Sequence, residues 1–276
     1  MMQVTNMREC LKNNLVVYRN MLTIPRKVKF GIELELEDVQ YDEINRLITE
    51  QFGSSWKVKK DKSLKKDCNA EIVVPPLCNE KQTWISFKKL AKLLGHVKPT
   101  YDHCSFQLNF DSSLLPKSKD KIKFLKLYAV YEDIIYRFSM GDDLDYRKSI
   151  EEYAYPIILT MKAYEEKELI DAFTNQKRHG INFKTNHIDL IEFRTPNACS
   201  NPITWQNYIT MFYYFIQYSL SSKCNEHLLD QYIEEFDRIY LLDEYKKCDD
   251  NKAFQLSLKL FKNQTDKYNF LSQYMK

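Results

Sequence analysis

Glycine and proline are scarce in this chain, which contains only 5 Gly and 8 Pro among 276 residues. Disordered and low-complexity segments are usually rich in both residue types and poor in large apolar ones. Here 44% of the residues are hydrophobic and 14% are aromatic, so we expect a compact core. The chain also lacks internal repeats and linker-like stretches. We therefore expect one domain over residues 1–276 rather than two.

Cysteine pairs of the Cys-x-x-Cys type are absent, and the seven cysteines are scattered along the chain. This pattern argues against a zinc ribbon or a disulfide scaffold and is typical of the reducing cytosol. Long apolar runs are missing too. The N-terminus lacks the apolar stretch of a signal peptide, and the most apolar run, residues 208–220, is short and contains Gln217. The sequence therefore predicts a cytoplasmic protein with no membrane partner.

A strong net charge is also missing, because 41 basic and 38 acidic residues leave a balance of only +3. The overall charge gives no support for nucleic-acid binding, and we expect no nucleic-acid partner. The densest basic run, KVKKDKSLKK at residues 57–66, either approaches phosphates or forms a solvated surface, and the second is the commoner case. A glycine-rich phosphate loop is absent. Any ATP would therefore be held by side chains, metal ions and strand edges.

A strictly alternating segment, residues 27–37, predicts a β-strand. Its apolar side chains share one face, and Glu33, Glu35 and Glu37 share the other. Neighbouring side chains on one face of a strand lie about 6.5–7 Å apart. Two carboxylates at that distance repel by on the order of 2 kcal/mol near a protein surface. The acidic face is therefore either a solvated outer surface or a platform for divalent metal ions.

Three further predicted strands carry polar residues on one face. These residues are Glu71 on the strand at 70–74, Ser105, Gln107, Asn109 and Asp111 on the strand at 104–111, and Glu192 and Arg194 on the strand at 187–194. Taken singly, each is explained by a solvated face or an exposed ion pair. Taken jointly, they predict a sheet with one concave polar face. Its oxygen ligands suit Mg²⁺ or Mn²⁺, and its arginine suits a phosphoryl group.

The remaining predicted elements are mainly helices. We expect strands at residues 56–60 and 181–184 and helices at residues 7–20, 41–52, 84–94, 118–139 and 150–173, followed by helices from Pro202 to the end. Gly95 is expected to cap the helix at 84–94. Because helices and strands do not alternate strictly, the predicted fold class is α+β. We expect a mainly antiparallel, curved sheet with its polar concave face on one side, helices on the other, and a helical C-terminal tail.

The order of these motifs resembles the amidoligase family. The motifs are FGIELELE at residues 30–37, DKS at 61–63, EIVVPP at 71–76, CSFQLN at 104–109, the segment from Tyr136-Arg137 to Arg147, IEFR at 191–194 and Asn201-Pro202. That family belongs to the glutamine synthetase and glutamate–cysteine ligase group of carboxylate–amine ligases. The resemblance covers roughly residues 28–215. It leaves the helix at 7–20 and the helical tail at 216–276 as additions to the core.

The resemblance implies an ATP-dependent ligase that forms an amide bond through an acyl phosphate, with ATP and Mg²⁺ or Mn²⁺ as cofactors. Its substrates would be a carboxylate and an amine, drawn from amino acids, peptides or small metabolites. The implied metal ligands are Glu33, Glu35, Glu71 and Glu192. Gln107 and Asn109 stand where the family usually shows His-x-His, so amide oxygens would complete the metal site.

The resemblance also assigns roles to the basic and amide side chains. Arg194 would contact the transferred phosphoryl group, and Asp61 would position the incoming amine. Arg137 and Arg147 are candidates for binding a carboxylate or a phosphate. Asn182 and Lys184 either line the same cofactor cleft or lie on a plain surface strand. Glu37 follows the core Gly-x-Glu-x-Glu motif. It is expected either to contact the metal ligands from behind, without binding the metal, or to face solvent.

Two other functions remain open at this point. The departure from His-x-His is consistent with a non-catalytic binding protein of the same fold, in which the amphipathic tail helices would contact a protein partner. A metal-dependent nuclease also holds two metals in an acidic cluster. Against the nuclease, the residue two positions after Glu71 is Val73 rather than lysine, and the overall charge is nearly balanced.

Overall fold

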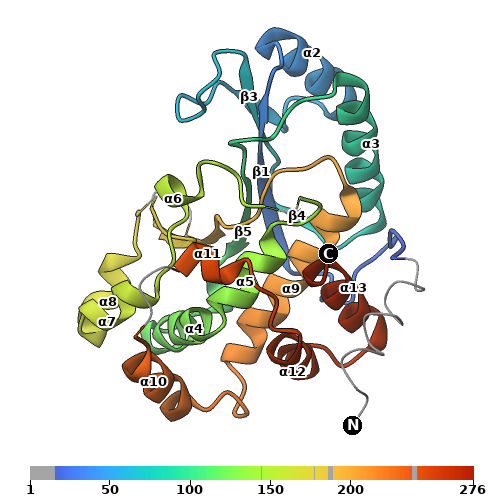
Figure 1. Cartoon of the computed structure of the whole chain (residues 1–276). Helices are drawn as coiled ribbons and strands as arrows, with labels where there is room; N and C mark the ends of the chain where they lie inside the picture. The colour runs from blue at the N-terminus through green and yellow to red at the C-terminus, as the bar shows by residue number, and fades with distance from the viewer. Residues whose placement is uncertain (1–15, 144, 177, 186–188, 238–240) are drawn as a thin grey trace.

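The computed structural model describes residues 16–143, 145–176, 178–185, 189–237 and 241–276 (Figure 1). Within these residues the chain forms an α+β fold with a seven-stranded open sheet and twelve α-helices. The strands are β1 (Lys29–Glu37), β2 (Lys57–Lys59), β3 (Asn69–Val73), β4 (Leu77–Cys78), β5 (Phe106–Asp111), β6 (Ile181–Lys184) and β7 (Leu190–Phe193). Their order is β2-β3-β1-β5-β7-β6, with β4 paired to the start of β1. All pairs are antiparallel, which confirms the predicted sheet type.

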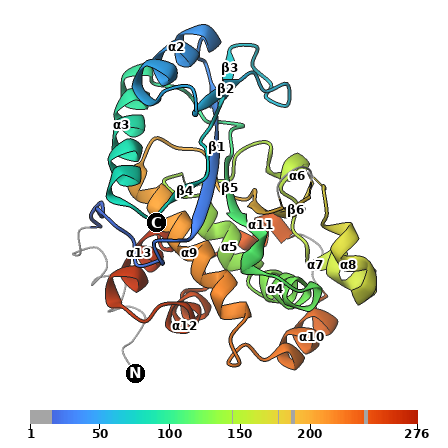
Figure 2. The same cartoon turned by 180° about the vertical axis from the view of Figure 1, so that it is seen from behind.

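The helices surround the sheet on one side and at its ends. They are α2 (Tyr41–Phe52), α3 (Lys81–Val97), α4 (Ser118–Val130), α5 (Glu132–Ser139), α6 (Ile150–Tyr153), α7 (Ile158–Ala163), α8 (Glu166–Ala172), α9 (Pro202–Ser219), α10 (Glu226–Glu235), α11 (Leu241–Tyr245), α12 (Asp250–Leu260) and α13 (Gln264–Tyr274). A short 3-10 turn, Ser112–Leu114, follows β5. Figures 1 and 2 show α2 and α3 beside the upper half of the long strand β1. Helices α10, α12 and α13 lie in the lower half of the molecule.

The apolar face of the sheet is buried against helices, as the alternation predicts. Every apolar position of residues 28–36 that faces this side is buried. Phe30 stacks on Trp84 of α3, with ring centroids 5.7 Å apart, and Phe106 stacks on Trp205 of α9 at 6.1 Å. Because burial of each large side chain contributes about 1.5–3 kcal/mol, this aromatic layer fixes α3 and α9 against the sheet.

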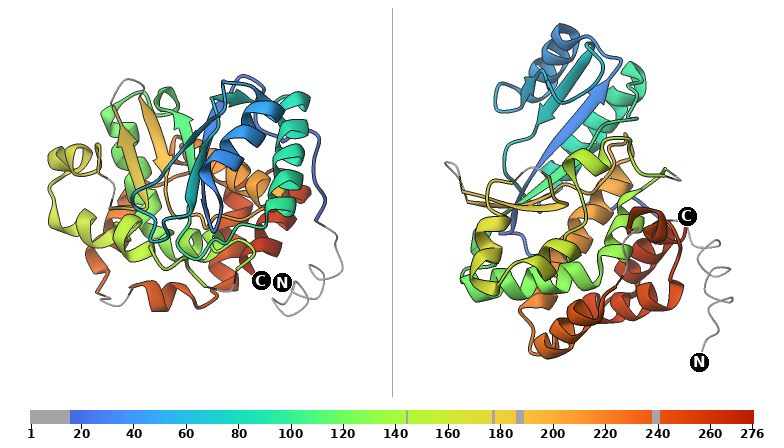
Figure 3. Two further views of the ribbon diagram at one scale, coloured as in Figure 1. Left: turned by 90° about the horizontal axis from the view of Figure 1, so that it is seen from above. Right: turned by 60° about the vertical axis from the view of Figure 1, so that its left-hand side comes forward.

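A second layer of helices lies behind the first. Helices α12 and α13 pack on α9, α10 packs on α4, and α11 packs on α5. Figure 3 shows the C-terminal helices gathered on one side of the sheet, so they leave its polar face open. Among the described residues, none of the helices combines the length and the apolar character that crossing a bilayer would need.

Several element boundaries differ from the sequence-based expectation. Helix α3 runs through Gly95 and ends at Lys98, which adopts a left-handed conformation (φ 55°) directly before Pro99. The helix expected at 118–139 breaks at Tyr131, and the one at 150–173 divides into α6, α7 and α8. Strand β4 was not predicted. Of the helix expected at 7–20, residues 16–20 are not helical and the rest lies outside the described residues, as do residues 187 and 188 of the last predicted strand.

Candidate functional site

The register of the sheet gathers the predicted polar residues on one face. Glu35 lies opposite Glu71, Glu33 opposite Gln107, and Asn109 opposite Glu192. Directly opposite residues in neighbouring strands have Cβ atoms about 4.5–5.5 Å apart. Side chains that are far apart in the sequence therefore meet in one patch that extends from β3 to β7.

A cavity of about 370 Å³ lies over this patch. Its other walls come from the loop after β2, from the residues just before β5 and from α6. Eight predicted site residues line it: Glu33, Glu35, Asp61, Glu71, Gln107, Arg147, Lys184 and Arg194. The remaining lining residues are Lys59, Lys60, Ser63, Leu64, His103, Ser105, Ser149 and Tyr153.

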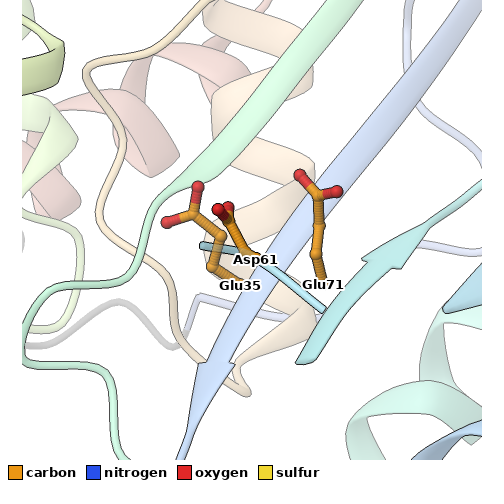
Figure 4. Close-up of side chains that lie close together, drawn as sticks. All are labelled: Glu35, Asp61 and Glu71. Atoms are coloured by element: carbon orange, nitrogen blue, oxygen red, sulfur yellow. The ribbon is translucent and has the colours of Figure 1, made fainter. Parts of the chain in front are cut away.

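Three carboxylates in the cavity form a metal-type ligand set. Figure 4 shows Glu35 on β1, Glu71 on β3 and Asp61 in the loop after β2, and one oxygen from each lies within 4.8 Å of the others. Ser63 holds Asp61 in place, because its backbone N and its Oγ both donate to Asp61 Oδ1, at 2.8 and 2.7 Å. Oxygens on opposite sides of a Mg²⁺ or Ca²⁺ ion lie about 4–5 Å apart, so this acidic triad fits a hard divalent cation.

The acidic triad is electrostatically incomplete without a cation. Burial raises the pKa of Glu71 to about 8, and the nearby carboxylates of Glu33, Asp61 and Glu35 add to that rise. Burial also raises the pKa of Glu35, although Arg147 and Ser105 oppose the effect. Carboxylates that resist ionisation together are stabilised by a proton or by a metal ion.

Glu33 and Glu192 lie outside the acidic triad, contrary to the expectation that both join Glu35 and Glu71 around metal. Lys184 Nζ lies 3.1 Å from Glu33 Oε1 and 2.5 Å from Glu192 Oε1. Burial alone would raise the pKa of Glu33, but Lys184 outweighs it and lowers that pKa. Glu192 is fully buried, and Asn182 Nδ2 donates to its Oε2 at 2.8 Å. Asn182 therefore supports Glu192 and does not line the cavity.

The two amides that replace His-x-His take different positions. Gln107 Nε2 donates to Glu35 Oε1 at 2.9 Å, and Gln107 Oε1 accepts from Arg194 Nη1 at 3.0 Å. Gln107 thus bridges two site residues instead of directing its oxygen at the acidic triad. Asn109 Nδ2 donates to Glu33 Oε1 at 2.9 Å. Its Oδ1 is buried without a hydrogen-bond partner in the described part of the chain.

The three predicted arginines differ in their placement. Arg194 lines the cavity, and its Nε donates to Tyr153 O at 2.9 Å. Arg147 is buried, and its guanidinium donates to the backbone oxygens of Arg194 and Thr195, at 2.8 and 3.0 Å. These hydrogen bonds hold the backbone after β7 in place, so this part of the guanidinium is not available to a substrate. Arg137 lies on α5 and does not line the cavity; its Nε donates to the backbone oxygen of Tyr274 at 3.4 Å.

Glu37 and three basic residues complete the description of the cavity. Glu37 was expected either behind the ligands or facing solvent; it is fully buried, and its Oε2 lies 3.2 Å from Nδ1 of His103, which lines the cavity. Lys59 and Lys60 also line it, and Lys59 lies opposite Glu71 in the sheet. The basic run at 57–66 was the signal for these lysines. His103 left no comparable signal, because it precedes the strand.

The cavity therefore combines a hard-cation ligand set with five cationic side chains, those of Lys59, Lys60, Arg147, Lys184 and Arg194. Such a combination can hold a metal ion together with phosphate or carboxylate groups. Comparison with models of protein families finds none that matches this chain, and comparison with curated proteins finds no match either.

Proposed function

We propose that this chain is an ATP-dependent carboxylate–amine ligase of the glutamine synthetase-like fold group. The proposal depends above all on one observation: the acidic triad and the cationic side chains share a single cavity on the polar face of an antiparallel sheet. The resemblance of the strand motifs to amidoligases supports the same function. A nucleotide bound there would need no glycine-rich loop, because lysine and arginine side chains, together with a bound metal ion, would hold its phosphates.

In this proposal Glu35, Asp61 and Glu71 hold Mg²⁺ or Mn²⁺. When bound, the metal ion would neutralise charge on the phosphates of ATP and help to align them. Arg194, Lys59 and Lys60 donate to phosphoryl oxygens and stabilise the charge that develops on them during transfer.

The proposed reaction has two steps. A carboxylate oxygen of the first substrate attacks the γ-phosphorus, the bond to the bridging oxygen breaks, and an acyl phosphate and ADP form. The amine nitrogen then attacks the acyl carbon, and phosphate leaves. Because Asp61 serves here as a metal ligand, the proton of the amine passes to His103. His103 Nδ1 lies 3.2 Å from Glu37 Oε2, and in the tautomer with its proton on Nδ1, Nε2 would accept the proton of the amine.

The test measures Mg·ATP binding by titration calorimetry and then ADP release over a panel of carboxylate and amine pairs. Glu35→Gln and Glu71→Gln are expected to lower ADP release by about 100-fold or more, since each removes a metal ligand, while thermal melting shows an intact fold. Glu50→Gln is the control, because Glu50 is exposed on α2, where it pairs with Arg46. It should leave ADP release unchanged.

A second candidate, the non-catalytic binding protein, is favoured by one observation. Gln107 and Arg147, two positions that the resemblance assigns to metal and substrate, make hydrogen bonds within the protein instead. Mg·ATP binding without ADP release for any substrate pair would favour this candidate. Absence of Mg·ATP binding would contradict the ligase.

A further inference from the structure

Lys184 occupies an unusual position for a lysine, between two carboxylates at the rim of the polar face. It lies on β6, whereas its partners Glu192 and Glu33 lie on β7 and β1, on either side of β5. Its side chain is only 26% exposed. The ammonium group therefore neutralises acidic side chains from two different strands at one point.

The groups around this ammonium resemble a ligand set for a hard cation. Glu33 Oε1 and Glu192 Oε1 both contact Lys184 Nζ. Asn109, on the strand between them, pairs in register with Glu192 and has a buried Oδ1 without a hydrogen-bond partner in the described residues. Two carboxylate oxygens and an amide oxygen on three adjacent strands are the ligand types that Mg²⁺ and Mn²⁺ prefer.

A cation is required at this point of the fold. Glu192 is fully buried, and a buried carboxylate is strongly destabilising unless a positive charge compensates it. Arg194 Nη1 lies 3.3 Å from the other oxygen of Glu192, so it does not replace the contact to Oε1.

We propose that the ammonium group of Lys184 takes the place of a second metal ion in this cavity. The cavity then holds one divalent cation, at Glu35, Asp61 and Glu71, and one cation of the protein itself, at Glu33 and Glu192. This inference rests on the proposed function only for the metal at the acidic triad. An ammonium group has three N–H donors. One of them donates to Glu33 Oε1, and Glu192 Oε1 lies 2.5 Å from the same nitrogen as an ion-pair partner. Because Lys184 lines the cavity, a further N–H is available to an anionic substrate group such as a phosphate.

The first test is the number of Mn²⁺ ions that the metal-free protein binds without nucleotide, measured by titration calorimetry and by the electron paramagnetic resonance signal of free Mn²⁺. Wild-type protein is expected to bind one equivalent. Glu192→Gln, which leaves Lys184 in place, should also bind one, whereas Glu71→Gln should bind none with comparable affinity. Two equivalents on the wild-type protein would overturn the proposal.

The second test removes the ammonium. Lys184→Met keeps a chain of similar length but leaves Glu33 and Glu192 without their cation, so a second equivalent of Mn²⁺ is expected. The double variant Lys184→Met/Glu192→Gln should return to one equivalent. Lys59→Met is the matched control: Lys59 lines the same cavity, but its Nζ lies 3.7 Å from Glu71 and it is half exposed, so one equivalent is expected.

The outcomes separate this inference from the proposed function. A folded Lys184→Met variant that still binds one equivalent would contradict the inference. If Lys184→Met does not fold, two equivalents of Mn²⁺ on the wild-type protein would still overturn the inference. Wild-type protein that binds no Mn²⁺, with a Lys184→Met variant that binds one equivalent, would support the role of Lys184 and contradict the acidic triad. None of these readouts requires ATP turnover.

Discussion

At the scale of single residues, Lys184 joins Glu33 to Glu192 across the polar face, whereas Glu35, Asp61 and Glu71 gather around one point. Alternation alone places Glu33, Glu35 and Glu71 on the polar face, since successive side chains point to opposite faces. Whether a polar side chain binds a ligand or a neighbour depends on distances of 1–2 Å that a sequence does not contain. Gln107 was therefore expected at a metal and instead bridges Glu35 and Arg194. Asp61 lies in a loop, whose path follows from packing rather than from periodicity.

The raised pKa of Glu71 leads to a prediction about pH and stability. In the folded, metal-free protein this pKa is about 8, against an ordinary value of 4.5. The folded state therefore binds more protons than the unfolded state between those values, and the free energy of unfolding should fall as pH rises from about 4.5 to 8. In Glu71→Gln this fall should be smaller by a few kcal/mol, since each pKa unit corresponds to about 1.4 kcal/mol.

Urea denaturation at pH 5 and at pH 9, in the presence of a chelator, measures this difference. Glu132 is fully buried with a pKa that burial likewise raises to about 8, so it contributes the same trend to both proteins and cancels in the comparison. Glu50→Gln, exposed on α2, should show the wild-type pH dependence. An unchanged pH dependence in Glu71→Gln would contradict the prediction.

At the scale of elements, strongly periodic segments could be predicted and their ends less well. Helix α2 has the predicted bounds, because its apolar positions repeat at helical spacing throughout. The end of α3 was misplaced because Gly95 was taken as a stop signal. The helix tolerates this glycine on its exposed side and ends where Pro99 disfavours helical geometry at Lys98. The break at Tyr131 arises from packing of α4 and α5 on different neighbours.

Two glycine substitutions test this view of the elements. Gly95→Ala should raise the free energy of unfolding by about 0.5–1 kcal/mol, because alanine favours the helix and a Cβ there meets nothing within 4 Å. Gly180→Ala should lower it by about 1–3 kcal/mol. Its Cβ would lie 2.6 Å from the hydroxyl of Tyr136 and 2.7 Å from Cγ2 of Thr195, both buried beside the start of β6.

Chemical denaturation of the two variants, alongside the wild-type protein, measures the expected rise and the expected fall in the free energy of unfolding in one experiment. The two substitutions are matched in chemistry, since each adds one methyl group at a glycine with ordinary backbone geometry. A destabilising Gly95→Ala would mean that α3 ends near residue 95 after all. A neutral Gly180→Ala would mean that β6 does not pack closely against the tyrosines of α4 and α5.

At the scale of the whole molecule, the fold class could be predicted but not the order of the strands. Mixed helices and alternating strands indicate an α+β fold with antiparallel pairing. The order β2-β3-β1-β5-β7-β6 pairs segments that are far apart in the sequence, and no local pattern specifies such pairings. The helical tail was expected to lie outside the core, and in the hypothesis of a binding protein its amphipathic helices contact a protein partner. Helices α12 and α13 of this tail pack on α9 within the same chain.

Deleting α13 should therefore destabilise the whole molecule. A chain that ends at Asn263 loses Phe270, Leu271 and Tyr274, which are buried against the rest of the protein. Each contributes about 1.5–3 kcal/mol, whereas a folded protein of this kind has a net stability of only about 5–15 kcal/mol. The deletion also leaves Arg19 without Asp266, its buried carboxylate partner. We expect the melting temperature to fall by at least about 10 °C, or the chain to remain unfolded.

Thermal melting followed by circular dichroism measures this effect, with deletion of Lys276 alone as the control. That shorter deletion removes a surface ion pair between Lys276 and Asp142, which contributes at most about 1 kcal/mol, so its melting temperature should stay within a few degrees of the wild type. If the chain ending at Asn263 melts like the full chain, α13 does not stabilise the fold. Its apolar side would then be free for a partner protein, as the hypothesis of a non-catalytic binding protein requires. If it melts much lower, the same side chains cannot both complete this core and bind another protein.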